Sequence, residues 1–121
     1  MKIDIKGTNL DLTEAIKEYI EMRIGILSKF LEKMDLEGVV KARVEIARTT
    51  THHKHGDVFR AECNLKIPGK LLRAEYEGED IRLCIDKIKD ELQLEIKKHK
   101  EKQRPQDTKS QERLRKLRGK E

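Results

Sequence analysis

Residues 79–102 read EDIRLCIDKIKDELQLEIKKHKEK, and this stretch decides the fold. Its apolar residues recur at spacings of three and four, which is typical of the buried side of a helix. These apolar positions are Ile81, Ile85, Ile88, Leu92 and Ile96. A carboxylate at Glu79 or Asp80 suits the helix start, where free amides and the dipole favour negative charge. The sequence therefore predicts one long helix with a buried side and a solvated side.

After Ile96 the apolar spacing stops and a basic run begins, formed by Lys97, Lys98, Lys100 and Lys102. Positive charge at a helix C-terminus complements the dipole and contributes about 0.3–1 kcal/mol per residue. A phosphate-binding arm would instead draw its energy from counterion release, and its affinity would fall steeply with salt. A membrane-surface anchor is the weakest alternative, because the core needs the apolar side of the helix.

A second helix is predicted earlier in the chain, over residues 16–34. Its apolar positions keep helical spacing for about five turns. They are Ile16, Tyr19, Ile20, Ile24, Leu27, Phe30, Leu31 and Met34. Asp11 or Thr13 would cap its start. Gly25 lies in its middle and costs about 1 kcal/mol relative to Ala.

Four further segments alternate between apolar and polar side chains, as half-buried strands do. They are residues 2–6, 39–48, 58–67 and 70–77. The last strand is expected to direct Leu72, Ala74 and Tyr76 inward. The polar residues 49–57 predict a hairpin loop, and Pro68 followed by Gly69 predicts a tight turn.

The predicted order is β-α-β-β-β-α, an α+β domain with a four-stranded sheet and two helices packed on one face. This layout resembles that of double-stranded-RNA-binding domains. The other face of the sheet would be solvated, with these basic residues among acids: Lys41, Arg43, Arg60, Lys66 and Arg73. We expect residues 1–102 to form the domain. Residues 103–121 lack an apolar stripe and are expected to be a basic, disordered tail.

The charge of this 121-residue chain is unevenly distributed. Residues 97–121 hold eleven Lys or Arg against four Asp or Glu, a net charge of +7, whereas the whole chain carries +5. Such asymmetry favours a polyanionic partner, most often nucleic acid, with a solubilising tail as the alternative. Two Phe, two Tyr and no Trp argue against RNA recognition by base stacking. Phosphate contact through Lys and Arg remains open.

Other kinds of chemistry are poorly represented in the sequence. Cys63 and Cys84 lie beside core positions, which predicts buried thiols in a reducing compartment, and nothing in their spacing supports a disulfide. His52, His53 and His55 share a predicted loop without a fourth ligand, so we predict no metal site and no cofactor. Without a nucleophile motif or a P-loop, we predict neither enzymatic activity nor a small-molecule substrate. With no signal sequence and no membrane span, we expect a cytoplasmic protein.

Several motifs, in order along the chain, resemble the short ribosome hibernation-promoting factors, also described as ribosome-associated inhibitors. Near the N-terminus, IDIKGTNL at 3–10 leads into LTEAI at 12–16. The later motifs are GDVFRAE at 56–62, NLKIPGKLLRAE at 64–75, EGED at 77–80 and KKHKEK at 97–102. The resemblance covers about residues 1–102.

This resemblance implies a stress-response factor that binds the small ribosomal subunit and its rRNA in the cleft between head and body. Bound there, it would occupy the path of messenger and tRNA and preserve idle ribosomes. The chain is too short for the second domain that pairs ribosomes in longer relatives, so pairing would need another hibernation factor.

The resemblance also implies the main phosphate contacts. These are Arg23 on the first helix and Lys98, Lys100 and Lys102 at the end of the last. Position on the helix faces adds Lys29, Lys33, Arg82, Lys89 and Lys97. The sequence departs from the family at Ile26 and Leu94, which are often basic in relatives, and at Arg82, which replaces a usual aromatic.

Two other function classes fit the same residues. A free-standing module that binds structured RNA other than the ribosome would have a similar layout, and naked duplex RNA would then compete with intact subunits. A protein-interaction domain whose tail recruits an acidic partner would be insensitive to nuclease.

Overall fold

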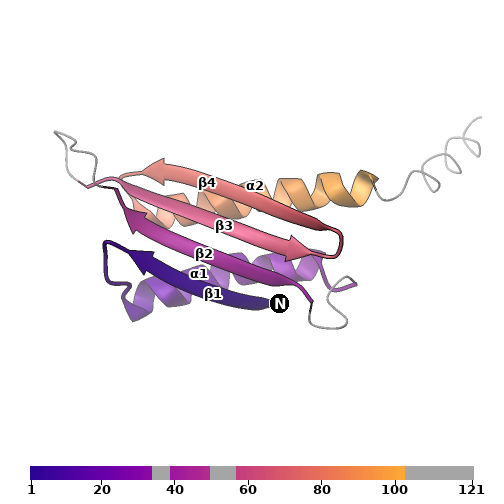
Figure 1. The fold of residues 1–121 in the computed structure, drawn as a ribbon, viewed down its shortest axis with the longest axis horizontal. Helices are drawn as coiled ribbons and strands as arrows, with labels where there is room; N and C mark the ends of the chain where they lie inside the picture. Colours follow the sequence, from indigo (N-terminus) through magenta and orange to yellow (C-terminus); the bar gives the residue numbers. More distant parts are fainter. Residues whose placement is uncertain (34–38, 50–56, 103–121) are drawn as a thin grey trace, which may run out of the picture.

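A computed structural model describes residues 1–33, 39–49 and 57–102 of the chain. Seven elements follow one another in this part, two of them forming one helical segment. They are β1 Lys2–Thr8, α1 Glu14–Gly25, the 3-10 helix η1 Ile26–Phe30, β2 Lys41–Arg48, β3 Phe59–Ile67, β4 Lys70–Gly78 and α2 Ile81–Lys102. Both helices cover the same face of the sheet (Figure 1), which confirms the predicted α+β architecture.

The sheet is mixed, with strand order β1-β2-β3-β4. β1 and β2 are parallel because α1 carries the chain back across the sheet between them, whereas the other two pairs are antiparallel. The register aligns the inward side chains, and Ala42, Leu65 and Leu72 occupy neighbouring positions. Gly69 forms the predicted turn between β3 and β4 at φ 78°, a conformation that disfavours side chains.

Helix α2 provides the largest share of the helical core. Asp80 caps it, since its Oδ1 accepts a hydrogen bond from the backbone amide of Arg82 at 2.9 Å. All of the predicted stripe except the half-buried Ile81 is buried. The sequence pattern indicated that the stripe ends at Ile96. In the structure the stripe continues, because His99 lies three residues further along the helix and is only 9% exposed. The core therefore reaches almost to the end of the helix.

The first helix is shorter than predicted. Thr13 caps it, its side chain accepting from the amide of Ile16 at 3.2 Å. The α-helix ends at Gly25, and residues 26–30 continue as η1. The prediction of one helix of about five turns was therefore wrong. Gly25 is a poor helix former, and the hydroxyl of Ser28 donates to the carbonyl of Gly25 at 2.7 Å, which competes with the α-helical pattern. Met34 lies outside the described residues.

Tyr76 is the other correction to the predicted core. Its side chain is 37% exposed, although it alternates in phase with the buried Leu72 and Ala74. β4 is an edge strand, so a large side chain near its end extends past the layer that the helices cover. The ring lies against its own strand, within 3.4 Å of the position that a Cβ on Gly78 would occupy.

Both cysteines are buried free thiols, as predicted. Burial raises the pKa of Cys63 to about 12 and also raises the pKa of Cys84. Both side chains therefore act as small apolar groups between the sheet and α2 rather than as nucleophiles.

Candidate nucleic-acid interface

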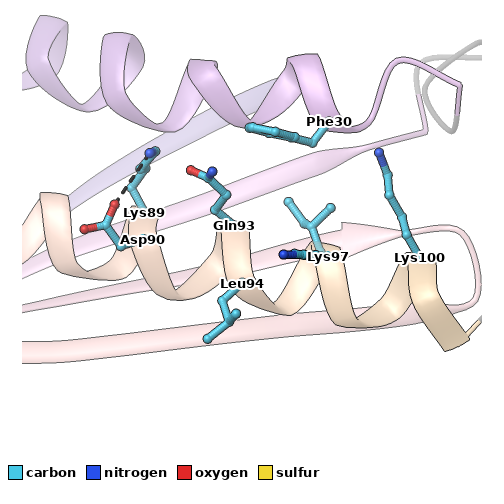
Figure 2. Close-up of a pocket in the computed structure, with 8 residues that line it drawn as sticks. Phe30, Lys89, Asp90, Gln93, Leu94, Lys97 and Lys100 are labelled. Carbon is cyan, nitrogen blue, oxygen red and sulfur yellow. Dashed lines mark hydrogen bonds and ion pairs between the residues drawn. The ribbon is translucent and has the colours of Figure 1, made fainter.

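A groove of about 490 Å³ runs between η1 and the C-terminal half of α2. It is lined by Phe30, Lys89, Asp90, Gln93, Leu94, Ile96, Lys97 and Lys100, and we call it the helix groove. Figure 2 shows Phe30 on η1 facing α2, with Lys89, Gln93 and Lys100 directed toward η1. The groove thus has an apolar side and a row of cations.

Its three lysines come from one side of α2 but differ in their surroundings. Lys89 is only 12% exposed, and its ammonium lies 3.5 Å from Asp90 Oδ1. Its alkyl stem therefore covers apolar surface while the charged end reaches a partner. Lys97 is exposed and Lys100 half-buried. Within the described residues neither of these two has an ion-pair partner, so both ammonium groups are available to an anion.

Four more of the predicted contacts lie on η1, directly after it, or on the last turns of α2, and do not line the groove. They are Lys29 on η1, Lys33 in the turn that follows, and Lys98 and Lys102 on the last turns of α2. All four are exposed. Lys98 lies 3.8 Å from Glu95 Oε1, a surface pair worth about 0–1 kcal/mol that a phosphate would readily replace. α1 and α2 run in the same direction (Figure 1), so these lysines gather at one end of the helix layer.

Arg23 and Arg82 occupy a different environment, toward the start of α2. Arg23 Nε donates to Asp86 Oδ1 at 2.9 Å, and the hydroxyl of Tyr19 donates to the same oxygen at 2.6 Å. The guanidinium of Arg82 lies 5.6 Å from the centre of the Tyr19 ring. The hydrogen bond to Asp86 is the main cause of the raised pKa of Tyr19. We call these four residues the Asp86 cluster, and they join α1 to α2.

The sequence patterns missed part of this arrangement. Asp86 lies outside the predicted apolar stripe of α2, yet its side chain is only 31% exposed and accepts hydrogen bonds from two residues of α1. Phe30, a member of the predicted apolar stripe, packs half-buried against the core and also lines the groove. Gln93 shares a helix side with Lys89 and Lys100, a spacing that would have identified it. Nothing in the sequence marked Phe30 or Asp86 for these positions.

Grouped metal ligands and membrane-spanning helices are both absent from the described part of the chain. Among residues 1–33, 39–49 and 57–102, no three or more His, Cys, Asp or Glu side chains are grouped to hold a metal ion. His52, His53 and His55 lie outside those ranges. None of the described helices is long and apolar enough to cross a membrane. The feature that remains is the concentration of cations around the helix groove.

Comparison with known proteins identifies relatives of this chain by sequence and by fold. Residues 3–104 match the family model described as sigma 54 modulation protein / S30EA ribosomal protein. A ribosome hibernation promoting factor of Azotobacter vinelandii is 30% identical over 85% of this chain and 86% of its own. The ribosome hibernation promoting factor of Escherichia coli K12 is 26% identical over 84% of this chain and 96% of its own. Among solved structures, the N-terminal domain of Thermus thermophilus Protein Y matches with a TM-score of 0.67 and 29% identity. The match covers 82% of this chain and 99% of that domain.

The family match spans most of the chain and includes all of the described elements except the first residue of β1, Lys2. Curated relatives in two organisms share the same name, and a solved domain shares the fold. The chain therefore belongs to the sigma 54 modulation protein / S30EA ribosomal protein family, which includes the ribosome hibernation promoting factors.

Proposed function

We propose that this protein binds the small ribosomal subunit, occupies the channel for mRNA and tRNA, and thereby silences and preserves idle ribosomes under stress or in stationary phase. Its role is binding rather than catalysis, and its place of action is the cytoplasm, where ribosomes are. The observation that carries the proposal is the helix groove, with lysines at one end of the helix layer that form no ion pair with a described residue, in a chain of this family.

The contacts would be made to rRNA phosphates. Phosphate contacts position a protein without reading sequence, which suits a factor that must fit one site of fixed shape. The groove lysines Lys97 and Lys100 are the central contacts of the proposal, because they line the groove and have no ion pair to give up within the described residues. The other proposed contacts are Arg23, Lys29, Lys33, Arg82, Lys89, Lys98 and Lys102.

The environment of each cation sets its expected contribution. Lys98 would exchange a weak surface pair for a phosphate at little cost. Arg23 has Nε engaged by Asp86, so only its two terminal nitrogens would reach RNA. Arg82 is exposed, and its stacking on Tyr19 leaves the edge of the guanidinium open. The arginines are thus held in place, whereas Lys97 and Lys100 have no ion-pair partner among the described residues.

The mechanism would be occlusion by a rigid body. The sheet and the helix layer share one core, so the folded domain would block a channel without changing shape. mRNA or tRNA could then enter only after the protein leaves. Many individually weak phosphate contacts would make the complex stable at moderate salt and reversible when conditions change.

Co-sedimentation with purified small subunits, with mRNA and initiator tRNA as competitors, tests this function. We expect binding that weakens as salt rises and is lost when the competitors fill the channel. Binding that persists alongside both competitors would contradict channel occupancy, and binding that moves to naked duplex RNA would favour a general RNA-binding module. Preparing the same complex after nuclease treatment of free RNA excludes bridging by contaminating RNA.

A further inference from the structure

Three lysines form a row across the outer face of the sheet, the face opposite the helices. The register pairs Lys2 with Lys41 and Lys41 with Lys66, so the three occupy adjacent positions on β1, β2 and β3. All three are exposed, and their neighbours along each strand point to the core. With strands about 4.8 Å apart, the row spans about 10 Å at the backbone. We call it the lysine row.

Nothing in the described part of the chain neutralises this row. No ion pair of 4.0 Å or less joins Lys2, Lys41 or Lys66 to any residue within 1–33, 39–49 and 57–102. Like charges directly opposite one another in a sheet are destabilising. An arrangement that costs folding stability and has no partner among the described residues points to an external anion.

The rest of the same face shows the contrast. Arg60 pairs with Glu62 at 3.1 Å and with Glu75. Arg73 pairs with Glu62 at 3.0 Å and with Glu75 at 3.2 Å. Two arginines and two glutamates thus neutralise one another across β3 and β4. The outer face is therefore divided into a self-neutralised part and the unneutralised lysine row.

Arg43 extends the row toward the middle of the sheet. It lies two residues beyond Lys41 on β2, is exposed, and forms no ion pair with a described residue. Its register neighbour on β1 is Asp4, but the two side chains are not within ion-pair distance. Four cations and one acid therefore share this corner of the outer face.

The position of the row relates it to the helix groove. β1 and β2 begin, and β3 ends, at the same end of the molecule where α2 ends (Figure 1). The lysine row and the helix groove thus lie at one end of the domain but on opposite faces. That end presents unpaired positive charge on both sides of a two-layer structure.

We infer that the lysine row, with Arg43, is a second phosphate-binding surface, which contacts an RNA strand on the sheet side while the helix groove contacts another strand on the helix side. This inference rests on the proposed function, because a wedge inside an RNA cleft meets phosphates on both of its faces. Flexible lysines without an aromatic neighbour in the row suit the sugar-phosphate backbone rather than bases. The domain would then be clamped from two sides.

Three variants of equal charge change test the inference. The first is Lys2→Gln with Lys41→Gln and Lys66→Gln, and the second is Lys97→Gln with Lys98→Gln and Lys100→Gln. The matched control is Lys6→Gln with Lys17→Gln and Lys87→Gln, three exposed lysines outside both surfaces. Binding of each full-length variant to small subunits is measured across a salt series, and thermal unfolding verifies that each is folded.

Each lost phosphate contact lowers the slope of log affinity against log salt by roughly 0.7–0.9. We expect the row variant to lose roughly two units of slope relative to the control, and the groove variant to lose a similar amount. A row variant that binds like the control, beside a weakened groove variant, would overturn the second surface and leave the proposed function standing. If the unmodified protein fails to bind subunits at low salt, both proposals fail.

Footprinting distinguishes two RNA strands from one. Hydroxyl-radical protection of the rRNA is compared for the row and groove variants at saturating protein concentration. We expect each variant to lose protection at a different set of nucleotides. Loss at the same nucleotides would contradict a separate strand. A Lys66→Cys variant carrying a photo-crosslinker should attach to rRNA, and attachment to a ribosomal protein instead would show that the row binds an acidic protein surface.

Discussion

The two halves of the helix layer use positive charge in opposite ways. Near the start of α2, Asp86 holds Arg23 and Tyr19, and Arg82 lies over the Tyr19 ring. Near its end, Lys97 and Lys100 line a groove without an ion-pair partner in the described chain. Basic side chains therefore stabilise the fold in one half and are available for binding in the other. Charge alone does not identify a binding residue; its partners do.

The largest expected effect is on binding, in the unpaired half. Reversing Lys97, Lys98, Lys100 and Lys102 to Glu should abolish small-subunit binding, because four attractive contacts become repulsive. The fold should persist, since these side chains lie outside the core. Co-sedimentation measures binding, and circular dichroism verifies folding. The control reverses Lys6, Lys17, Arg48 and Lys87. Retained affinity in the test variant would show that the helix end is not the contact.

The largest effect on stability is expected in the paired half. Asp86→Ala leaves the Tyr19 hydroxyl and the half-buried Arg23 without their acceptor and should lower the free energy of unfolding by about 1–3 kcal/mol. Chemical denaturation measures the change. Asp90→Ala removes an exposed acid from the same helix and should cost less than about 1 kcal/mol. Equal effects of the two variants would refute a structural role for the Asp86 cluster.

The paired half should also respond to alkaline pH. The hydrogen bond to Asp86 raises the pKa of Tyr19 in the folded protein above 10.0. An unfolded Tyr ionises at lower pH, so this contribution is present below about pH 10 and is lost as pH rises through the folded pKa. Tyr19→Phe should remove about 1–2 kcal/mol at neutral pH. The difference in stability between the two proteins should then shrink in alkaline solution, whereas a constant difference would argue against the hydrogen bond.

Arg23 pairs with Asp86 and is also a proposed phosphate contact, so it can contribute both to stability and to binding. Arg23→Ala should destabilise the domain by about 1–2 kcal/mol, since Asp86 loses a charged donor. If a terminal nitrogen also contacts a phosphate, the salt slope of binding should flatten by roughly one unit. Lys100→Ala should flatten the salt slope of binding by a similar amount without lowering the unfolding midpoint. A slope unchanged by Arg23→Ala would restrict this arginine to the fold.

The smallest effect is expected where the two halves meet. Gly25 ends α1 with right-handed helical dihedral angles, and an added Cβ would meet nothing within 4 Å. Gly25→Ala should therefore stabilise the fold by about 0.4–1 kcal/mol, mainly by restricting the unfolded chain. Thermal unfolding detects this change, and subunit binding should stay the same. A destabilised variant would indicate that the change from α-helix to η1 needs glycine.

The periodicity of apolar residues was sufficient to predict the architecture, but it did not predict which side chains interact with one another. The stripe on α2 and the alternation in the strands determined the element order, both helix caps to within two candidates, and nearly all of the core. Periodicity gave no sign that Ser28 would compete for the Gly25 carbonyl and change the helix type. Nor did it show that Tyr76 would extend past the helix layer at a sheet edge.

For the candidate site, sequence patterns located the cations but not their environments. Arg23, Lys89 and Lys97 all lie outside the apolar stripes of their helices, yet one is bound to Asp86, one is mostly covered, and one is free of ion pairs among the described residues. These differences depend on where a neighbouring helix lies. His99 shows the same limit, because its burial completes a stripe that appeared to end at Ile96.

The most direct test compares both halves in one experiment. Lys97→Ala with Lys100→Ala, and Asp86→Asn, are each assayed for small-subunit binding across a salt series and for thermal unfolding. We predict that the lysine pair lowers the salt slope by roughly 1.5 units with no loss of stability. Asp86→Asn should lower the unfolding midpoint and leave the slope unchanged. If the lysine pair leaves the slope as in the unmodified protein, the helix groove is not the RNA contact and the central claim is wrong.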